Sequence, residues 1–214
     1  MGKLLNGING PFSGKVGTAV GVMWKGLPVI RARPHRRTSG FSPLELQQQA
    51  KFSLMSGFLG PLIPLLNQTF RPEAAHLTGY NKAFSYNVKN AITGVHPELA
   101  IDYPVVLLGR GDLPNALSPS AASLVAGRLD FSWTDNSGKG RALATDQAFA
   151  AAYNEELKQW EYSLNLATRS AGTCTMDIKW ISGNPLQTYL GFISADGKEI
   201  TDTVYIGLVS LPVA

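Results

Sequence analysis

A glycine-rich stretch near the start of the chain, residues 10–34, constrains the fold more than any other segment. Its sequence is GPFSGKVGTAVGVMWKGLPVIRARP. A single strand is expected from Lys15 to Trp24. Four of its alternate residues would lie on one face: Val16, Thr18, Val20 and Val22. A turn at Lys25 and Gly26 separates this segment from a second one that begins at Pro28. The pattern predicts a β-hairpin.

The glycines of this hairpin are too frequent for ordinary strands. Glycine inside a strand is unfavourable unless a bulge, a bend or a close backbone approach requires it. Four glycines within thirteen residues therefore predict that the hairpin packs closely against another backbone. We expect an interface formed by these glycines and two flanking side chains, namely Gly14, Lys15, Gly17, Gly21, Trp24 and Gly26.

Basic residues crowd the end of the hairpin, before Thr38, Ser39 and Gly40 break the pattern. Cationic side chains beside a tryptophan suit phosphate backbones and stacked bases. A solvated loop, or arginines that pair with acids on a neighbouring copy, would have the same composition. The residues expected to bind an anionic partner are Lys25, Arg31, Arg33, Arg36 and Arg37, with His35 among them.

Charge is distributed unevenly along the 214 residues. Residues 1–110 hold 12 basic and 4 acidic side chains, a balance of +8, and residues 111–214 hold 7 and 11, a balance of −4. Such a chain can bind nucleic acid or an acidic surface through its first half, or stack head to tail with its own copies. Two domains of different composition would show the same asymmetry. Charged residues make up 16% of the chain, fewer than the roughly 25% typical of soluble domains, which favours self-association.

Two helices are expected after the hairpin. Ser42, Pro43 and Glu45 form a capping box with proline at the first helical position. The apolar stripe that follows is Leu46, Ala50, Leu54 and Phe58. A second helix is predicted over 79–91, where apolar residues recur every four positions. A short strand is expected over 105–108.

The second half of the chain has the pattern of short strands. Apolar residues alternate over 129–133, 160–166 and 174–180, and further strands are expected over 148–154, 189–194 and 204–211. Six or seven strands in about 95 residues predict an antiparallel sandwich. The expected fold class is α+β, with a glycine-rich hairpin and two helices in a domain over 1–112 and a β-sandwich domain over 113–214.

Known catalytic and metal-binding patterns do not fit the sequence. The run from Gly10 to Lys15 has three residues between its glycines and a valine where a phosphate loop needs Ser or Thr. His35, His76 and His96 are far apart and no cysteine pair accompanies them. Glu155, Glu156 and Glu161 surround Lys158 and are expected in a solvated turn, and the single cysteine, Cys174, in a buried position. No catalytic residue, metal or cofactor is predicted.

Three segments together resemble a family of bacterial proteins of about this length that is known only as a domain of unknown function. They are the stretch over 10–34, the run SYNVKNAI at 85–92 and the run YPVVLLGRG at 103–111. The second half is similar, at the level of fold, to fibronectin type III and immunoglobulin-like sandwiches. Neither resemblance implies an activity or a catalytic residue.

The sequence therefore favours a non-enzymatic structural or assembly protein. We expect it to self-associate, or to dock on a larger particle, through the glycine-rich hairpin. One alternative is a basic nucleic-acid-binding module that uses the arm from Arg31 to Arg37. A second is an adhesin-like or carbohydrate-binding sandwich that uses Trp133, Trp160 and Trp180, although their alternation predicts mostly core positions.

The segment at residues 1–7 lacks the apolar run of a signal peptide, so none is expected, and no run of about 20 apolar residues could span a membrane. We expect synthesis in the cytoplasm, with incorporation into a particle or leaderless export both open. The expected partners are copies of the same chain or another assembly protein, and nucleic acid is possible.

Overall fold

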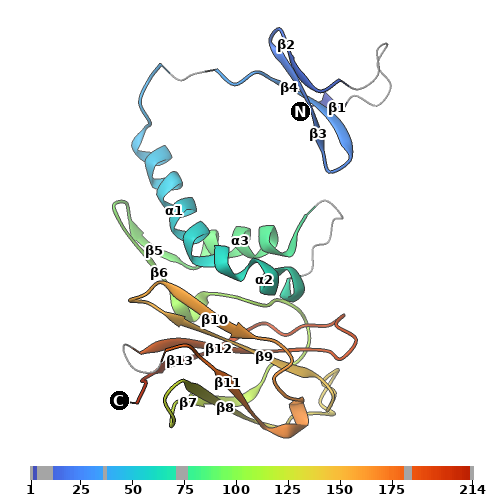
Figure 1. Ribbon diagram of the computed structural model, residues 1–214, viewed down its shortest axis with the longest axis vertical. Coiled ribbons are helices and arrows are strands. Elements are labelled where there is room, and N and C mark those ends of the chain that lie inside the picture. The colour runs from blue at the N-terminus through green and yellow to red at the C-terminus, as the bar shows by residue number, and fades with distance from the viewer. Residues whose placement is uncertain (1, 4–11, 36–37, 71–76, 181–184, 213–214) are drawn as a thin grey trace. The chain divides into compact units, whose positions relative to one another are not determined.

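The computed structural model describes residues 2–3, 12–35, 38–70, 77–180 and 185–212. The chain divides into two compact units, Met1–Ser42 and Pro43–Ala214, called here the N-terminal unit and the C-terminal unit. The first is a small β-sheet, and the second combines helices with a four-stranded, a three-stranded and a two-stranded sheet (Figure 1). The chain is therefore an α+β protein, as predicted.

The N-terminal unit is an antiparallel sheet with the strand order β1-β4-β3-β2. Its strands are β1 (Gly2–Lys3), β2 (Gly14–Val16), β3 (Ala19–Trp24) and β4 (Leu27–Ala32). The predicted turn is confirmed, because Lys25 and Gly26 have φ angles of 48° and 79°, which is the backbone that a two-residue hairpin turn requires. The single strand expected from Lys15 is wrong. The chain reverses at Gly17, where φ is 56°, so β2 and β3 are two strands of a three-stranded meander.

Three helices and a short 3-10 turn begin the C-terminal unit: α1 (Pro43–Leu59), η1 (Gly60–Leu62), α2 (Ile63–Thr69) and α3 (Gly79–Asn90). Helix α1 begins at the predicted proline, and α3 matches the second predicted helix. The predicted apolar stripe of α1 is correct in part: Phe58 is buried, but Leu46 is 40% exposed. The reason is that α1 packs on the remainder of the unit through its last turns, where Met55 and Leu59 are also buried.

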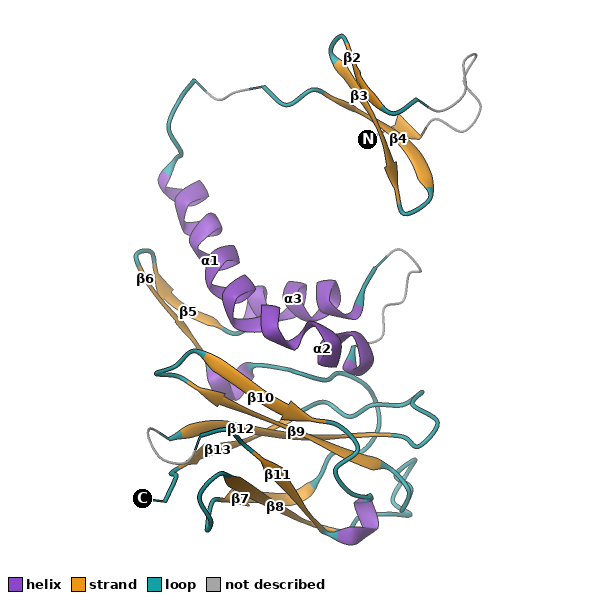
Figure 2. Cartoon of the chain, in the orientation of Figure 1, coloured by secondary structure: helices purple, strands orange, loops and turns teal. Residues whose placement is uncertain are grey.

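Two antiparallel sheets form the predicted sandwich (Figure 2). The three-stranded sheet has the order β11-β8-β7 and consists of β7 (Leu117–Ala122), β8 (Arg128–Thr134) and β11 (Thr173–Asp177). The four-stranded sheet has the order β10-β9-β12-β13 and consists of β9 (Gln147–Asn154), β10 (Gln159–Ser163), β12 (Leu186–Ile193) and β13 (Val204–Val209). The 3-10 turn η3 (Arg169–Ala171) precedes β11, and a separate hairpin, β5 (Ile92–Val95) with β6 (Glu98–Ile101), follows α3.

Helices cover the outer face of the four-stranded sheet, so the C-terminal unit has three layers (Figure 2). Strand β9 is buried on both faces, and its alternate residues belong to two cores. Ala148, Ala150 and Ala152 lie in the core between the sheets, and Phe149, Ala151 and Tyr153 lie in the core beneath the helices. The predicted division at 112/113 thus differs from the observed one at 42/43. The helices cannot form a separate domain because they share a core with the sandwich.

Specific hydrogen bonds hold the helical layer on the sheet. The Trp160 Nε1 donates to the Phe58 carbonyl at 2.8 Å and so joins β10 to α1. The Asn87 side chain pairs with both backbone groups of Leu107, at 2.9 and 3.0 Å. The strand predicted over 105–108 is therefore wrong: the turn η2 (Tyr103–Val105) begins this segment, and a helix side chain takes the place of a strand partner at Leu107.

A buried ion pair stabilises the loop region of the sandwich. The Arg169 Nε donates to Asp146 at 3.0 Å, and both side chains are fully buried. The guanidinium also donates to Asn136 at 2.8 Å and lies 3.9 Å from the centre of the Phe192 ring. Burial lowers the pKa of Arg169 against the opposing effect of Asp146. Breaking such a pair leaves an uncompensated buried charge, so this contact has a structural role.

Candidate functional site

The glycines of the N-terminal sheet serve turns and internal packing. Gly14, Gly17 and Gly26 have positive φ angles of 109°, 56° and 79°, and a side chain at any of them would meet open space. At Gly21 a Cβ atom would overlap both the carbonyl oxygen and the ring of Phe12. The close backbone approach that the glycines predict is therefore present, but it lies inside this unit.

Apolar side chains gather at the turn between β3 and β4, residues 23–27, which we call the hairpin tip. Met23 is 63% exposed, Trp24 42% and Leu27 37%. The Lys25 ammonium lies 5.8 Å from the centre of the Trp24 ring, within range of a cation–π contact. The tip therefore combines exposed apolar area with a positive charge.

Basic residues gather at the opposite end of the same sheet, which we call the cationic end. Lys15 and Arg31 are the two cross-strand neighbours of Val20, so they flank it on one face. The Arg33 backbone N–H donates to the Thr18 carbonyl at 2.7 Å, and this bond holds Arg33 beside the β2–β3 turn. All three basic side chains are exposed. Arg36 and Arg37 lie outside the described residues.

The predicted interface residues thus do not form one cluster. Gly17 lies at the cationic end and Trp24 and Gly26 lie at the hairpin tip. The six residues of β3 separate the two ends by about 20 Å. Lys15 also belongs to the cationic end, and Gly14 and Gly21 pair with each other along the strands between the two turns. The sequence prediction joined two surfaces of different chemistry.

The two units carry net charges of opposite sign, +7 for residues 1–42 and −3 for residues 43–214. Residues 1–42 contain seven basic and no acidic residues, and residues 43–214 contain 12 basic and 15 acidic residues. The N-terminal unit is thus uniformly cationic, whereas the C-terminal unit is weakly acidic. This contrast favours contact of the N-terminal unit with an acidic partner.

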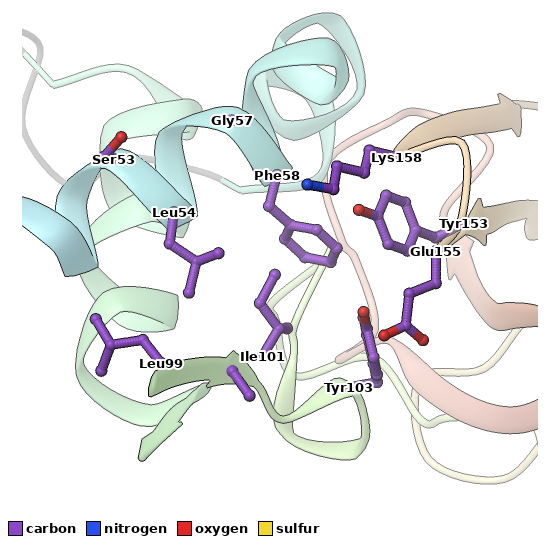
Figure 3. Close-up of a pocket in the computed structure, with 11 residues that line it drawn as sticks. Ser53, Leu54, Gly57, Phe58, Leu99, Ile101, Tyr103, Tyr153, Glu155 and Lys158 are labelled. Atoms are coloured by element: carbon purple, nitrogen blue, oxygen red, sulfur yellow. The ribbon is translucent and has the colours of Figure 1, made fainter. Parts of the chain in front are cut away.

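A pocket of about 460 Å³ opens within the C-terminal unit (Figure 3). Helix α1 supplies Leu54, Gly57 and Phe58, and β6 supplies Ile101. The turn between β9 and β10 supplies Lys158. In Figure 3 the leucine and isoleucine side chains lie at one end, and Tyr103, Tyr153 and Glu155 lie at the other. The pocket therefore has an apolar part and a polar part.

The polar part of this pocket has a distinct electrostatic character. Burial, and next the negative charge of Glu155, raises the pKa of Tyr103. The same two causes, in the same order, raise the pKa of Tyr153. Both phenols therefore remain neutral hydrogen-bonding groups at physiological pH, beside a carboxylate.

The family model of one protein family matches residues 11–207, nearly the whole chain. The chain belongs to the family of unknown function DUF6266. This confirms the resemblance drawn from the glycine-rich stretch and the two later motifs. No curated protein sequence matches the chain.

Fibronectin type III domains are among the solved structures that resemble this DUF6266 chain. The fn3 domain of human collagen alpha-1(XX) is 13% identical, with a TM-score of 0.36 over 50% of this chain and 93% of that one. The fn3 domain of human contactin 1 is 5% identical, with a TM-score of 0.32 over 49% and 84%. The FN1–FN3 domains of chicken CNTN1 are 13% identical, with a TM-score of 0.34 over 50% and 38%.

Other residues singled out from the sequence lie apart from these surfaces. Trp133, Trp160 and Trp180 are buried in the two cores, so they offer no exposed stacking platform to a sugar. His35 and His96 are exposed, and His76 lies outside the described residues. Among the residues that the structure describes, no three histidine, cysteine or acidic side chains are grouped to hold a metal ion. In the same part of the chain, no helix has both the length and the apolar character that crossing a bilayer requires.

Sequence reasoning missed the pocket because its residues come from distant parts of the chain. Glu155 and Lys158 are exposed at the β9–β10 turn, as expected, but the turn also borders the pocket. The one available signal was Gly57, a glycine within a helical pattern. Glycine inside a helix is unfavourable, yet α1 continues through Gly57 to Leu59.

Proposed function

We propose that this protein is a non-enzymatic assembly protein, and that its N-terminal unit docks on a second copy of the chain. The observation that carries the proposal is the hairpin tip, where Met23, Trp24 and Leu27 are exposed together. A unit without acidic residues carries this tip, and the remainder of the chain has an excess of acids. Charge complementarity of this kind steers association and fixes orientation.

The energetics favour a modest but specific contact. Complete burial of a large apolar side chain contributes roughly 1.5–3 kcal/mol, and the three tip side chains are already partly covered. The tip therefore supplies a few kcal/mol, and the charge contrast between units adds a term that salt screens. A contact between unlike surfaces is heterologous, so it repeats from copy to copy and produces rings or open chains.

The test is sedimentation velocity of the full chain after nuclease treatment, over a range of concentrations and salt. A Met23→Ser/Trp24→Ser variant should sediment as a monomer where the wild type forms larger species. Val16→Ser is the matched control, because Val16 is 62% exposed in the same unit but lies at the cationic end. Equal association of the tip variant and the control would refute docking through the tip.

The cationic end favours a second candidate function, the binding of nucleic acid. Lys15 and Arg31 flank Val20 on one face, and Arg33 is held beside the adjacent turn. Several cations on one surface neutralise neighbouring phosphates and release counterions. This candidate needs the cationic end and not the tip, so the two functions are separable.

Fluorescence anisotropy with a labelled single strand of mixed sequence tests this candidate. A Lys15→Gln/Arg31→Gln variant should weaken binding for every sequence and reduce the salt slope by about one for each phosphate contact removed. Lys139→Gln, which neutralises an exposed lysine of the C-terminal unit, should leave binding unchanged. Absence of binding at low salt rejects nucleic acid as a partner.

A further inference from the structure

We propose that the pocket between α1, β6 and the β9–β10 turn binds an organic ammonium ion. The charged group lies against Glu155 and the tyrosines, and the apolar part lies against Leu54, Phe58 and Ile101. This site lies wholly in the C-terminal unit and is independent of the docking proposed for the N-terminal unit. Its volume of about 460 Å³ falls within the roughly 300–1,000 Å³ of small-molecule sites.

Gly57 is the first observation that points to a ligand. It lies inside α1, where glycine costs about 1 kcal/mol relative to alanine. A Cβ atom at this position would meet nothing within 4 Å, and its backbone has no positive φ that would require glycine. Packing and conformation therefore leave this glycine unexplained. Because Gly57 lines the pocket (Figure 3), a long side chain at this position would enter the opening.

Two other glycines of the C-terminal unit differ from Gly57, because a side chain at either position would clash with its neighbours. A side chain at Gly79 would overlap the Leu66 carbonyl, and one at Gly191 would crowd the Phe149 ring. The fold itself requires glycine at these two positions. Gly60 also has open space around it, but it lies after α1, in η1, and is not among the residues that line the pocket.

The aromatic rings beside the pocket favour a cation. The ring centres of Phe58 and Tyr153 are 4.9 Å apart, and Tyr103 lies 6.1 and 6.0 Å from them. The negative faces of aromatic rings attract ammonium groups, and the attraction grows when water is partly excluded. The three rings are tilted against one another by 38° to 78°, so they do not form one aromatic cage, and an ammonium would contact them from one side.

The pocket is lined by one acidic and one basic side chain, so their positions decide where a cationic ligand can bind. Four titratable groups line it: Tyr103, Tyr153, Glu155 and Lys158. The carboxylate of Glu155 is the charged side chain that raises the pKa of both tyrosines, after burial. Lys158 carries the opposite charge, and its ammonium lies beside Phe58 and Tyr153, on the side opposite the Glu155 carboxylate (Figure 3). The ligand's ammonium should therefore bind on the Glu155 side, away from Lys158.

Isothermal titration of the full chain at pH 7 with n-hexylammonium, n-hexanol and hexanoate tests the proposal. We expect n-hexylammonium to bind with a Kd in the millimolar range and at least about tenfold more tightly than the other two compounds, a difference of about 1.4 kcal/mol. Equal binding of n-hexanol would show that charge is not selected. Stronger binding of hexanoate would show that Lys158, and not Glu155, determines the charge of the ligand that binds. Either result, or no binding, overturns the proposal.

Variants locate the site. Glu155→Gln should weaken n-hexylammonium binding about tenfold, and Lys158→Gln should strengthen it a few-fold because a like charge is removed. Gly57→Leu should abolish binding by filling the opening. Gly57→Ala, its matched control, should retain binding and melt at a higher temperature than the wild type. Undiminished binding in Glu155→Gln or in Gly57→Leu, with thermal melting showing that each variant is folded, rejects this pocket as the site.

Discussion

Separation of the chain at residue 42 should leave a folded protein, whereas separation at residue 112 should not. Among the described residues, both hydrophobic cores of the C-terminal unit draw on residues 55–211. A fragment of residues 43–214 therefore keeps both cores complete. A fragment of residues 113–214 loses the helices that cover one face of the four-stranded sheet.

The cost of that loss follows from four side chains on the uncovered face. Phe149, Tyr153, Trp160 and Tyr189 are all buried in the core that the helices share. Exposure of a large apolar side chain costs roughly 1.5–3 kcal/mol, so the four together cost about 6–12 kcal/mol. This equals the whole stability of a typical domain, about 5–15 kcal/mol. The shorter fragment should therefore lack a cooperative transition.

Circular dichroism melts of the two fragments and the full chain measure this directly. Fragment 43–214 should show near-ultraviolet signals from its packed aromatic residues and a cooperative melt close to that of the full chain. Fragment 113–214 should show neither. A cooperative melt of fragment 113–214 within a few degrees of the longer fragment would refute the three-layer argument.

Three further predictions concern single groups. Gly21→Val should overlap Phe12 and increase hydrogen exchange across β2 and β3 while the melt of the C-terminal unit stays the same; unchanged exchange would mean that the sheet adapts. Arg169→Leu should lower the free energy of unfolding in urea by about 3–5 kcal/mol, because Asp146 loses its buried partner. An Arg169→Leu/Asp146→Leu variant should recover part of this loss. A loss below about 1 kcal/mol in Arg169→Leu would contradict the structural role of the ion pair. Burial raises the pKa of Cys174 from 9.0 to about 12. The stability that the neutral thiol contributes is therefore complete below pH 9 and is lost as the pH rises towards 12. Cys174→Ala should flatten the decline in melting temperature between pH 9 and 12, and an identical decline in the variant would show that the thiol is not responsible.

Local signals were sufficient to predict much of the fold. The turn at Lys25 and Gly26 could be predicted because few sequences adopt two consecutive positive φ angles. The start of α1 at Pro43 followed from the capping pattern. Strand β9 was harder, because its alanines fill one core while Phe149 and Tyr153 fill the other. A strand buried on both faces loses the alternation of apolar and polar residues that marks a sheet surface.

The domain boundary and the pocket could not be predicted for a different reason. Turn residues around 112 resemble a linker, and only tertiary packing shows that the helices share a core with β9 and β12. The pocket joins side chains that are about a hundred residues apart in sequence, such as Phe58 and Lys158. The glycine spacing of the N-terminal stretch correctly indicated a close backbone approach, but the partner is Phe12 of the same unit. Periodicity reports local geometry and does not identify the neighbouring segment.

The size of the native particle shows whether the N-terminal unit joins copies of this chain. Sedimentation velocity of the nuclease-treated full chain should show species larger than the 23.0 kDa chain that grow with concentration and shrink with added salt. Fragment 43–214, which keeps both cores but lacks the hairpin tip, should remain a monomer throughout. A full chain that stays monomeric over the same range, or a fragment that associates equally well, would contradict the account.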